Sequence, residues 1–283
     1  MDIRPIQQRK YSFEFFPPKT EEGIERLNAT TLQLGQLSPH FFSVTYGAGG
    51  STRDRTLETV LAIKNMGHAA APHLSCIGTT RSSVRETLAN YSQQGIRHMV
   101  ALRGDLPSGM VAAGEFRYAS DLVAFIREEL GDEISIEVAA YPEYHPQCGS
   151  AQQDLLHFKH KIEAGANSAI TQYFYNADAY FRFIDDCTAM GIYVPIVPGI
   201  MPINNYFQLA RFSEICGAEI PRWIRLRLEG YRDDIASIRA FGLDIVTDLC
   251  DRLLQHGAPG LHFYTLNQAG PSSTIWQRLG IQA

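Results

Sequence analysis

Short runs rich in β-branched and aromatic residues alternate with amphipathic helical segments along this whole chain, giving eight strand–helix pairs. The strand-like runs are residues 11–17, 41–46, 70–77, 97–104, 134–141, 168–174, 194–200 and 260–267. The helical segments are 21–37, 55–67, 82–95, 118–131, 150–166, 176–191, a longer region at 203–256 and a last segment around 272–279. Alternation of this kind predicts a parallel sheet whose strands are connected by helices.

Eight units is the number that closes a (β/α)8 barrel. The 283 residues give about 35 residues per unit, the size of a βαβ step. The alternative, an open doubly wound sheet, would normally carry a glycine fingerprint, and the run 47–51 does not complete G-x-G-x-x-G. We therefore expect an α/β fold, a single TIM barrel over residues 1–283 as one domain. Breaks near Pro221 and Gly230 should divide the 203–256 region into extra helices between strands seven and eight.

Composition narrows the kind of partner. The net charge of -5 and the pI near 6.0 show no basic excess, which argues against nucleic acid and favours a small-molecule substrate. The chain has no apolar run of the roughly 18 residues that a membrane span needs, and its first residues lack the apolar core of a secretory signal. Five cysteines stand singly, without a C-x-x-C pair, as expected for reduced thiols in a cytoplasmic protein.

Polar side chains occur within or at the ends of six consecutive predicted strands. Barrels of this type keep their chemistry at the C-terminal strand ends, where such side chains converge. A single residue of this kind is usually a satisfied core group, but six in corresponding places predict one shared site. These residues are Glu14, Thr45, His73, Arg103 with Asp105, Tyr141 and Gln172.

Glu14 lies in the aromatic run SFEFFPP. Strand alternation places Phe13 and Phe15 on one face and Glu14 on the other, with Ser12 and Phe16. An inward carboxyl group in a mostly apolar site should have a raised pKa, stay protonated near neutral pH and act as a general acid. The alternative is a structural ion pair with an arginine.

Asp105 follows Arg103 and Gly104, where the fourth predicted strand becomes its loop. A carboxylate at that position could face a developing positive charge in a substrate. The alternative is an aspartate that caps a turn or a helix.

Asp154, His157 and Lys161 stand at i, i+3 and i+7 of the fifth helical segment and so share one face. This stripe could hold ribose hydroxyls and phosphates, and the alternative is a solvated polar face. The spacings H-x-x-H-x-x-E at 157–163 and H-x-x-C at 145–148 each lack the second half of a zinc site, so we expect no metal.

Several strings, in this order, resemble the methylenetetrahydrofolate reductase family over nearly the whole chain. They are SFEFFPPKT, SVTYGAGGSTRDRT, APHLSC, GIRHMVALRGDLP, YASDLV, AAYPEYHP, AGANSAITQYF, PGIMP and HFYTLN. The resemblance is to the bacterial type, which consists of the catalytic domain only. It implies a (β/α)8 barrel that binds FAD and reduces 5,10-methylenetetrahydrofolate to 5-methyltetrahydrofolate with NADH or NADPH, in one-carbon metabolism and methionine synthesis.

The resemblance also implies roles for individual residues. Glu14 matches the acid that protonates N10 of the folate, which opens the five-membered ring to a 5-iminium cation. Asp105 matches the aspartate that stabilises this cation. The implied substrate contacts are Gln172, Phe212, Gln208 and Gln268. The implied FAD contacts are Thr45, Tyr46, Ala48, His73, Arg103, Gly104, Asp105, Tyr118, Ala119, Tyr141, His145, Asp154, His157, His160 and Lys161.

Three positions depart from the family pattern. Gln268 stands where the family usually has arginine, which puts affinity for the folate tail and its polyglutamate form in question. His157 and His160 stand where asparagine and arginine are common. A histidine, with an ordinary pKa near 6.5, is a weaker phosphate partner than arginine, so we expect looser or more pH-dependent FAD binding.

One shared site for folate and nicotinamide implies ping-pong turnover. Two alternatives are a flavoprotein of the same family reduced by a protein electron donor, and a catalytically silent barrel that binds folate or flavin. By analogy with bacterial relatives we expect a homo-oligomer. The sequence leaves the choice between NADH and NADPH open, because no ribose-phosphate pocket is legible in it.

Overall fold

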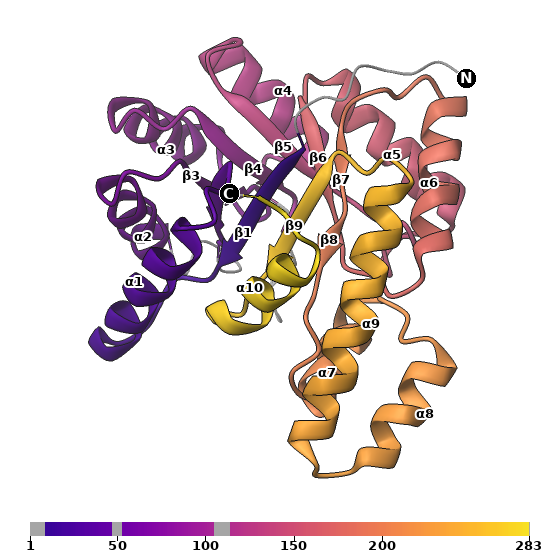
Figure 1. Ribbon diagram of the computed structural model, residues 1–283. Helices are drawn as coiled ribbons and strands as arrows, with labels where there is room; N and C mark the ends of the chain where they lie inside the picture. The colour runs from indigo at the N-terminus through magenta and orange to yellow at the C-terminus, as the bar shows by residue number, and fades with distance from the viewer. Residues whose placement is uncertain (1–8, 47–52, 105–113, 283) are drawn as a thin grey trace.

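The computed structural model describes residues 9–46, 53–104 and 114–282. Its strands form one parallel sheet in the order β7-β6-β5-β4-β3-β2-β1-β9-β8, surrounded by helices (Figure 1). The strands are β1 (Lys10–Phe15), β2 (Phe41–Val44), β3 (Ala70–Ser75), β4 (His98–Leu102), β5 (Ser135–Ala140), β6 (Ser168–Thr171), β7 (Ile196–Val197), β8 (Gly199–Ile200) and β9 (Gly260–Tyr264). The helices are α1 (Glu21–Gly35), α2 (Arg53–Asn65), α3 (Arg81–Gln93), α4 (Ala119–Leu130), α5 (Ala151–Glu163), α6 (Ala177–Ala189), α7 (Tyr206–Cys216), α8 (Arg222–Tyr231), α9 (Ile235–Gln255) and α10 (Ala269–Arg278).

The seventh predicted strand joins the two edges of the sheet. Its first half, β7, pairs with β6, and its second half, β8, pairs with β9. Pro198 separates the halves because it has no N–H to continue a ladder, although its carbonyl accepts a hydrogen bond from the His262 N–H (3.0 Å). Residues 196–200 therefore pair with both β6 and β9, and this closes the sheet into a barrel. This confirms the predicted (β/α)8 fold.

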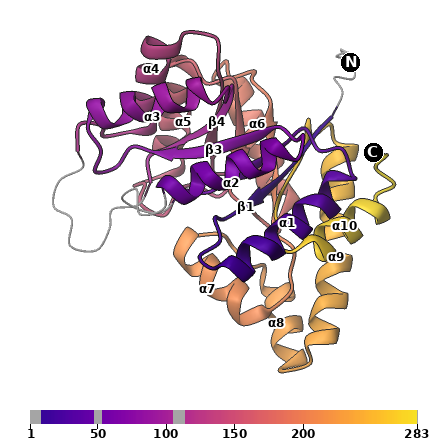
Figure 2. The same ribbon diagram turned by 90° about the vertical axis from the view of Figure 1, so that its left-hand side faces the viewer.

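The region between β8 and β9 forms the extra helices α7, α8 and α9. Gly217, in the left-handed conformation (φ 75°), ends α7, and Pro221 is the N-cap of α8. The break predicted near Pro221 is thus confirmed. The second break falls at Arg232, because Gly230 lies inside α8 and Asp234 caps α9. In both views α7 and α8 project from one side of the barrel (Figures 1 and 2).

Strand β1 alternates as predicted. Phe13 and Phe15 are buried on its outer face, where Phe13 stacks on Phe42 (5.9 Å) and Phe263 (5.5 Å) of the neighbouring strands. Each buried phenylalanine contributes about 1.5–3 kcal/mol of transfer free energy. This aromatic layer fixes the opposite face of β1, with Glu14, toward the barrel interior.

Helix starts follow capping chemistry. Thr80 is the N-cap of α3, and its Oγ1 accepts a hydrogen bond from the Ser83 N–H (3.2 Å). The Ser83 Oγ in turn accepts a hydrogen bond from the Thr80 N–H (3.2 Å), which completes a capping box. The predicted start at Ser82 is therefore late, because the run TTRSS offers several capping residues. Asn176, the first residue of the helical segment predicted at 176–191, is the N-cap of α6.

All five cysteines lie in the described part of the chain and are free thiols. Burial raises the pKa of Cys76 and of Cys187 to about 12. Within the described residues, no helix has the length and apolarity needed to cross a membrane.

Candidate active site

A cavity of about 400 Å³ opens where the barrel strands end, and we call it the mouth cavity. Five of the predicted strand-end residues line it, each from a different strand or the loop directly after it. They are Glu14, Thr45, His73, Tyr141 and Gln172. The sequence prediction of convergence on one mouth is thus met for these five side chains.

The carboxylate of Glu14 lies between two histidines. Its Oε2 is 3.3 Å from Nε2 of His73 on β3 and 3.4 Å from Nε2 of His262 on β9. The Glu14 side chain is 16% exposed, whereas that of His262 is fully buried. Among the described residues its ion-pair partners are therefore imidazoles rather than the arginine considered from sequence.

These partners reverse the expected protonation of Glu14. Burial by itself raises the pKa of the Glu14 carboxyl, but the charges of His73 and His262 and the hydrogen bond of His262 outweigh it and lower the pKa to about 2. The predicted raised pKa is wrong, since sequence reasoning counted burial without these two partners. Glu14 is ionised at neutral pH here, so it can donate a proton only after receiving one.

The backbone around Glu14 is held by the loop after β9. Thr265 Oγ1 donates to the Glu14 carbonyl (2.6 Å), and the Asn267 side chain bonds both the N–H and the carbonyl of Phe16 (3.0 and 2.9 Å). Leu266 (φ 50°) and Asn267 (φ 57°) are both left-handed, a conformation that costs about 1–2 kcal/mol for a residue such as leucine and less for asparagine. The strain is maintained because these bonds tie the ends of β1 and β9 together.

Apolar side chains complete the mouth cavity. Phe212 on α7 lines it as predicted, together with Met201, Tyr264 and Leu266. Two other predicted substrate contacts, Gln208 and Gln268, are exposed and do not line the mouth cavity.

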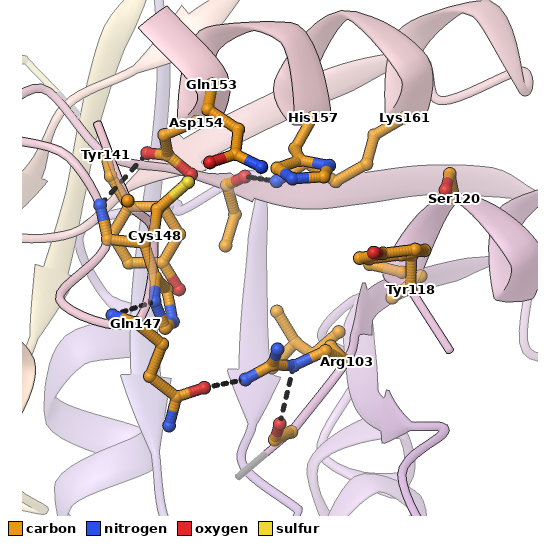
Figure 3. Close-up of a pocket in the computed structure, with 17 residues that line it drawn as sticks. Arg103, Tyr118, Ser120, Tyr141, Gln147, Cys148, Gln153, Asp154, His157 and Lys161 are labelled. Atoms are coloured by element: carbon orange, nitrogen blue, oxygen red, sulfur yellow. Dashed lines mark hydrogen bonds between the residues drawn. The ribbon is translucent and has the colours of Figure 1, made fainter. Parts of the chain in front are cut away.

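A second cavity of about 400 Å³, the side cavity, lies between the ends of β4 and β5 and helices α4 and α5 (Figure 3). It shares Leu102, Ala139 and Tyr141 with the mouth cavity, so the two adjoin. The predicted contacts in its lining are Arg103, Gly104, Tyr118, Ala119, Tyr141, His145, Asp154, His157 and Lys161. Tyr46 lines the mouth cavity, His160 is exposed outside both, and Ala48 and Asp105 lie outside the described residues.

The α5 stripe faces the side cavity. Asp154 and Lys161 are buried, which excludes the solvated polar face considered from sequence. Asp154 accepts the His145 N–H (3.0 Å), and the Lys161 ammonium donates to the Ala139 carbonyl (2.5 Å). Burial lowers the pKa of Lys161 to about 8, against the opposing charge of Asp154, so Lys161 is a cation at pH 7.

Aromatic and cationic groups face each other across the side cavity. The rings of Tyr118 and His157 stack at 5.1 Å and 25°, and Arg103 bonds the side chain of Gln147 (Figure 3). Gly104 is left-handed (φ 83°), and a Cβ there would collide with Ser75 Oγ. Glycine therefore lets the chain turn between Arg103 and the following loop.

Sequence reasoning missed several lining residues. Strand alternation within HFYTLN places His262 and Tyr264 on the inward face, and that signal could have found them. Ser120, Gln147, Cys148 and Gln153 line the side cavity from helix starts and a loop, where the sequence has no such pattern.

Fold and site together define a barrel enzyme with an ionisable, partly apolar mouth and an adjoining cavity that carries cations. The family model for methylenetetrahydrofolate reductase matches residues 2–280. The chain belongs to the methylenetetrahydrofolate reductase family of oxidoreductases.

Similar proteins agree with this assignment. The chain is 46% identical over 272 residues to the 5,10-methylenetetrahydrofolate reductase of Pectobacterium carotovorum subsp. carotovorum, covering 96% of this chain and 90% of that protein. It is 39% identical over 288 residues to methylenetetrahydrofolate reductase (NADH) 1 of Arabidopsis thaliana, covering 97% of this chain and 49% of that protein. A solved Clostridium thermocellum protein, described as binding two copies of 5-methyl-5,6,7,8-tetrahydrofolic acid, matches with TM-score 0.68 and 18% identity over 97% of this chain and 96% of that one, which supports the fold.

Proposed function

We propose that this protein reduces 5,10-methylenetetrahydrofolate to 5-methyltetrahydrofolate with FAD and NAD(P)H, serving one-carbon metabolism and methionine synthesis. The observation that carries the proposal is the position of Glu14, a carboxylate aimed into a partly apolar mouth that adjoins a cation-bearing cavity. A binding module would not need an ionisable group held in this way between two imidazoles. Family membership supplies the reaction class.

The side cavity fits FAD. Its buried Lys161 ammonium and its Arg103 guanidinium suit phosphates, while the buried Asp154 carboxylate suits ribose hydroxyls. The residues that would hold FAD are those predicted contacts that line the two adjoining cavities. When bound, the flavin carries a hydride equivalent from nicotinamide to folate.

The mouth cavity fits the substrates. Phe212, Leu266 and Tyr264 offer apolar and aromatic surface for planar rings. Gln172 would hydrogen-bond the pterin and the nicotinamide in turn, and Glu14 would give its proton to N10 of the folate. Asp105, which follows β4, is proposed to stabilise the resulting cation.

Both substrates would use the same mouth cavity, and this supports ping-pong turnover. The name of the Arabidopsis relative specifies NADH, which supports a nicotinamide donor rather than a protein donor. We also propose that residues 1–283 act as one catalytic domain, in the cytoplasm and as a homo-oligomer.

Purified protein tests the proposal directly. We expect a flavin absorbance spectrum, bleaching on anaerobic addition of NADH or NADPH, and recovery of the colour on addition of 5,10-methylenetetrahydrofolate. A protein that cannot be loaded with FAD contradicts the proposal. If neither NADH nor NADPH bleaches the flavin, the electron donor is a protein. If the flavin is bleached but 5,10-methylenetetrahydrofolate does not restore its colour, the protein is a catalytically silent barrel.

A further inference from the structure

Tyr173 directly follows Gln172 at the end of β6, and its hydroxyl reaches helix α7, which carries Phe212. Gln172 and Phe212 both line the mouth cavity. We infer that Tyr173 is a positioning residue whose hydrogen bonds hold α7, and with it Phe212, in place for binding nicotinamide and folate. This inference rests on the proposed function, in which both substrates use the mouth cavity.

Two side chains of α7 meet the Tyr173 hydroxyl. Its oxygen is 3.0 Å from Ser213 Oγ, and the Cys216 thiol donates a hydrogen bond to it (3.4 Å). Ser213 and Cys216 stand at i and i+3, so they lie on one face of the helix. A phenol oxygen can accept one bond and donate another, so the hydroxyl can accept from Cys216 and donate to Ser213. Tyr173 is 3% exposed, and water therefore competes little for these bonds.

Few other side chains hold α7 against the barrel. Of its eleven residues only Leu209 and Ser213 are buried, and a helix of this length is marginal in water without tertiary contacts. Beyond the C-terminal end of α7, the Glu219 N–H donates to the Glu143 carboxylate (2.8 Å). The bonds of the Tyr173 hydroxyl act instead within the helix, at the residue next to Phe212.

The backbone of Tyr173 holds the other substrate contact. The Tyr173 N–H donates to Gln172 Oε1 (3.0 Å), which fixes the orientation of the Gln172 amide at the end of β6. The Tyr173 ring also packs edge-on against the ring of Tyr264 (6.3 Å), which lines the mouth cavity. Tyr173 thus sets the relative position of Gln172 and Phe212. Removal of its hydroxyl alone should release Phe212 and leave Gln172 in place.

The surroundings of the hydroxyl assign it a positioning role rather than a role in proton transfer. Burial and the hydrogen bond from Cys216 raise the pKa of Tyr173 above its ordinary value of 10, so the hydroxyl is neutral near pH 7. When a binding-competent state is less populated, the apparent Kd of its ligand rises in proportion. Loss of the hydroxyl should therefore weaken substrate binding and leave the chemical steps nearly unchanged.

The test compares Tyr173→Phe with Tyr180→Phe. Tyr180 is a buried tyrosine of α6 whose hydroxyl donates to the Ile196 carbonyl (2.8 Å) and which does not line the mouth cavity. Rapid-mixing absorbance follows each half-reaction over a range of NADH or 5,10-methylenetetrahydrofolate concentrations. We expect Tyr173→Phe to raise the apparent Kd of both substrates about tenfold, with limiting rates within about twofold of wild type. Tyr180→Phe should keep the wild-type Kd values.

Limited proteolysis measures the docking of α7 without a substrate. Arg211 is exposed on α7, and trypsin cuts after an arginine when the helix around it opens. We expect the cut after Arg211 to be about tenfold faster in Tyr173→Phe than in wild type or Tyr180→Phe.

A double-mutant cycle tests whether Tyr173 acts through Ser213. Ser213→Ala should raise the apparent Kd values by itself, but it should add little to Tyr173→Phe, because the bond between the two residues is already absent. The inference is overturned if Tyr173→Phe keeps the wild-type Kd values, if its cut after Arg211 is not faster, or if the two substitutions have additive effects. If Tyr173→Phe does not fold, wild-type Kd values in Ser213→Ala overturn it. Failure of the wild-type protein to turn over either substrate would instead overturn the proposed function.

Discussion

Glu14 and His262 stand 248 residues apart in the chain, yet their side chains meet at 3.4 Å inside the barrel. They meet because β9 pairs with β1, with Ser12 opposite His262 and Glu14 opposite Tyr264. The candidate acid thus depends on the last strand of the barrel for its charge state. A fragment without β9 would leave Glu14 without one of the two imidazoles that hold it.

Replacing Glu14 should change the rates of the two half-reactions to different extents. We expect Glu14→Gln to reduce the folate half-reaction by roughly 10²–10⁴-fold, the usual contribution of a general acid, and to leave flavin reduction by NAD(P)H nearly intact. Rapid-mixing absorbance of each half-reaction measures this. Glu14→Asp, which keeps the carboxyl group on a shorter stem, is the matched control and should retain more activity. Equal losses in both halves would mean that Glu14 has a structural role.

Much of this site could be predicted from the sequence because strand ends of a barrel must converge. Alternation in SFEFFPP fixed the inward direction of Glu14, and helical spacing placed Asp154, His157 and Lys161 on one face. The charge state of Glu14 could not be predicted in the same way. It depends on the distances to His73 and His262, which the closure of the barrel sets.

The placement of side chains in loops and at exposed positions could not be predicted from the sequence either. Gln208 and Gln268 could be chosen only by resemblance, and they lie in the first turn of α7 and at the N-cap of α10, outside the cavities. A family pattern gives the residue at a position. It does not give the direction of the side chain without its neighbours.

The depressed pKa of Glu14 predicts acid sensitivity of the fold. A carboxyl whose pKa falls from the ordinary 4.5 to about 2 on folding adds stability that is complete above pH 4.5. This stability is lost as the pH falls toward 2, and its linkage value is on the order of 3 kcal/mol. Urea unfolding should show a gap between wild type and Glu14→Gln that narrows as the pH drops from about 5 to 3. A gap that is constant over this interval would contradict the assigned pKa.

The lowered pKa of Lys161 predicts that FAD binding weakens at alkaline pH. Because burial lowers its pKa to about 8, the cation is lost as the pH rises through that value, and its attraction for phosphate goes with it. We expect the Kd for FAD to rise by about tenfold in Lys161→Met at pH 7, and the variant to lose the weakening above pH 8. Fluorescence titration measures both. Lys159→Met is the matched control, since Lys159 pairs with Glu163 (3.7 Å) outside the cavity. Equal effects of the two variants would remove Lys161 from the FAD site.

The hydrogen bonds between the loop after β9 and the end of β1 should affect both the stability of the protein and the position of Glu14. Asn267→Ala removes two hydrogen bonds to Phe16 and leaves an alanine at φ 57°, so we expect a loss of about 1–3 kcal/mol in the free energy of unfolding. Asn267→Gly removes the same bonds but tolerates the backbone conformation, so it should cost less at equilibrium. Both variants should slow folate reduction more than flavin reduction, because the bonds hold the end of β1 that carries Glu14. Denaturant unfolding and the rates of the two half-reactions measure these effects. Equal stability of the two variants would show that the left-handed backbone at residue 267 carries no strain. Unchanged rates of folate reduction would show that the bonds between Asn267 and Phe16 do not position Glu14.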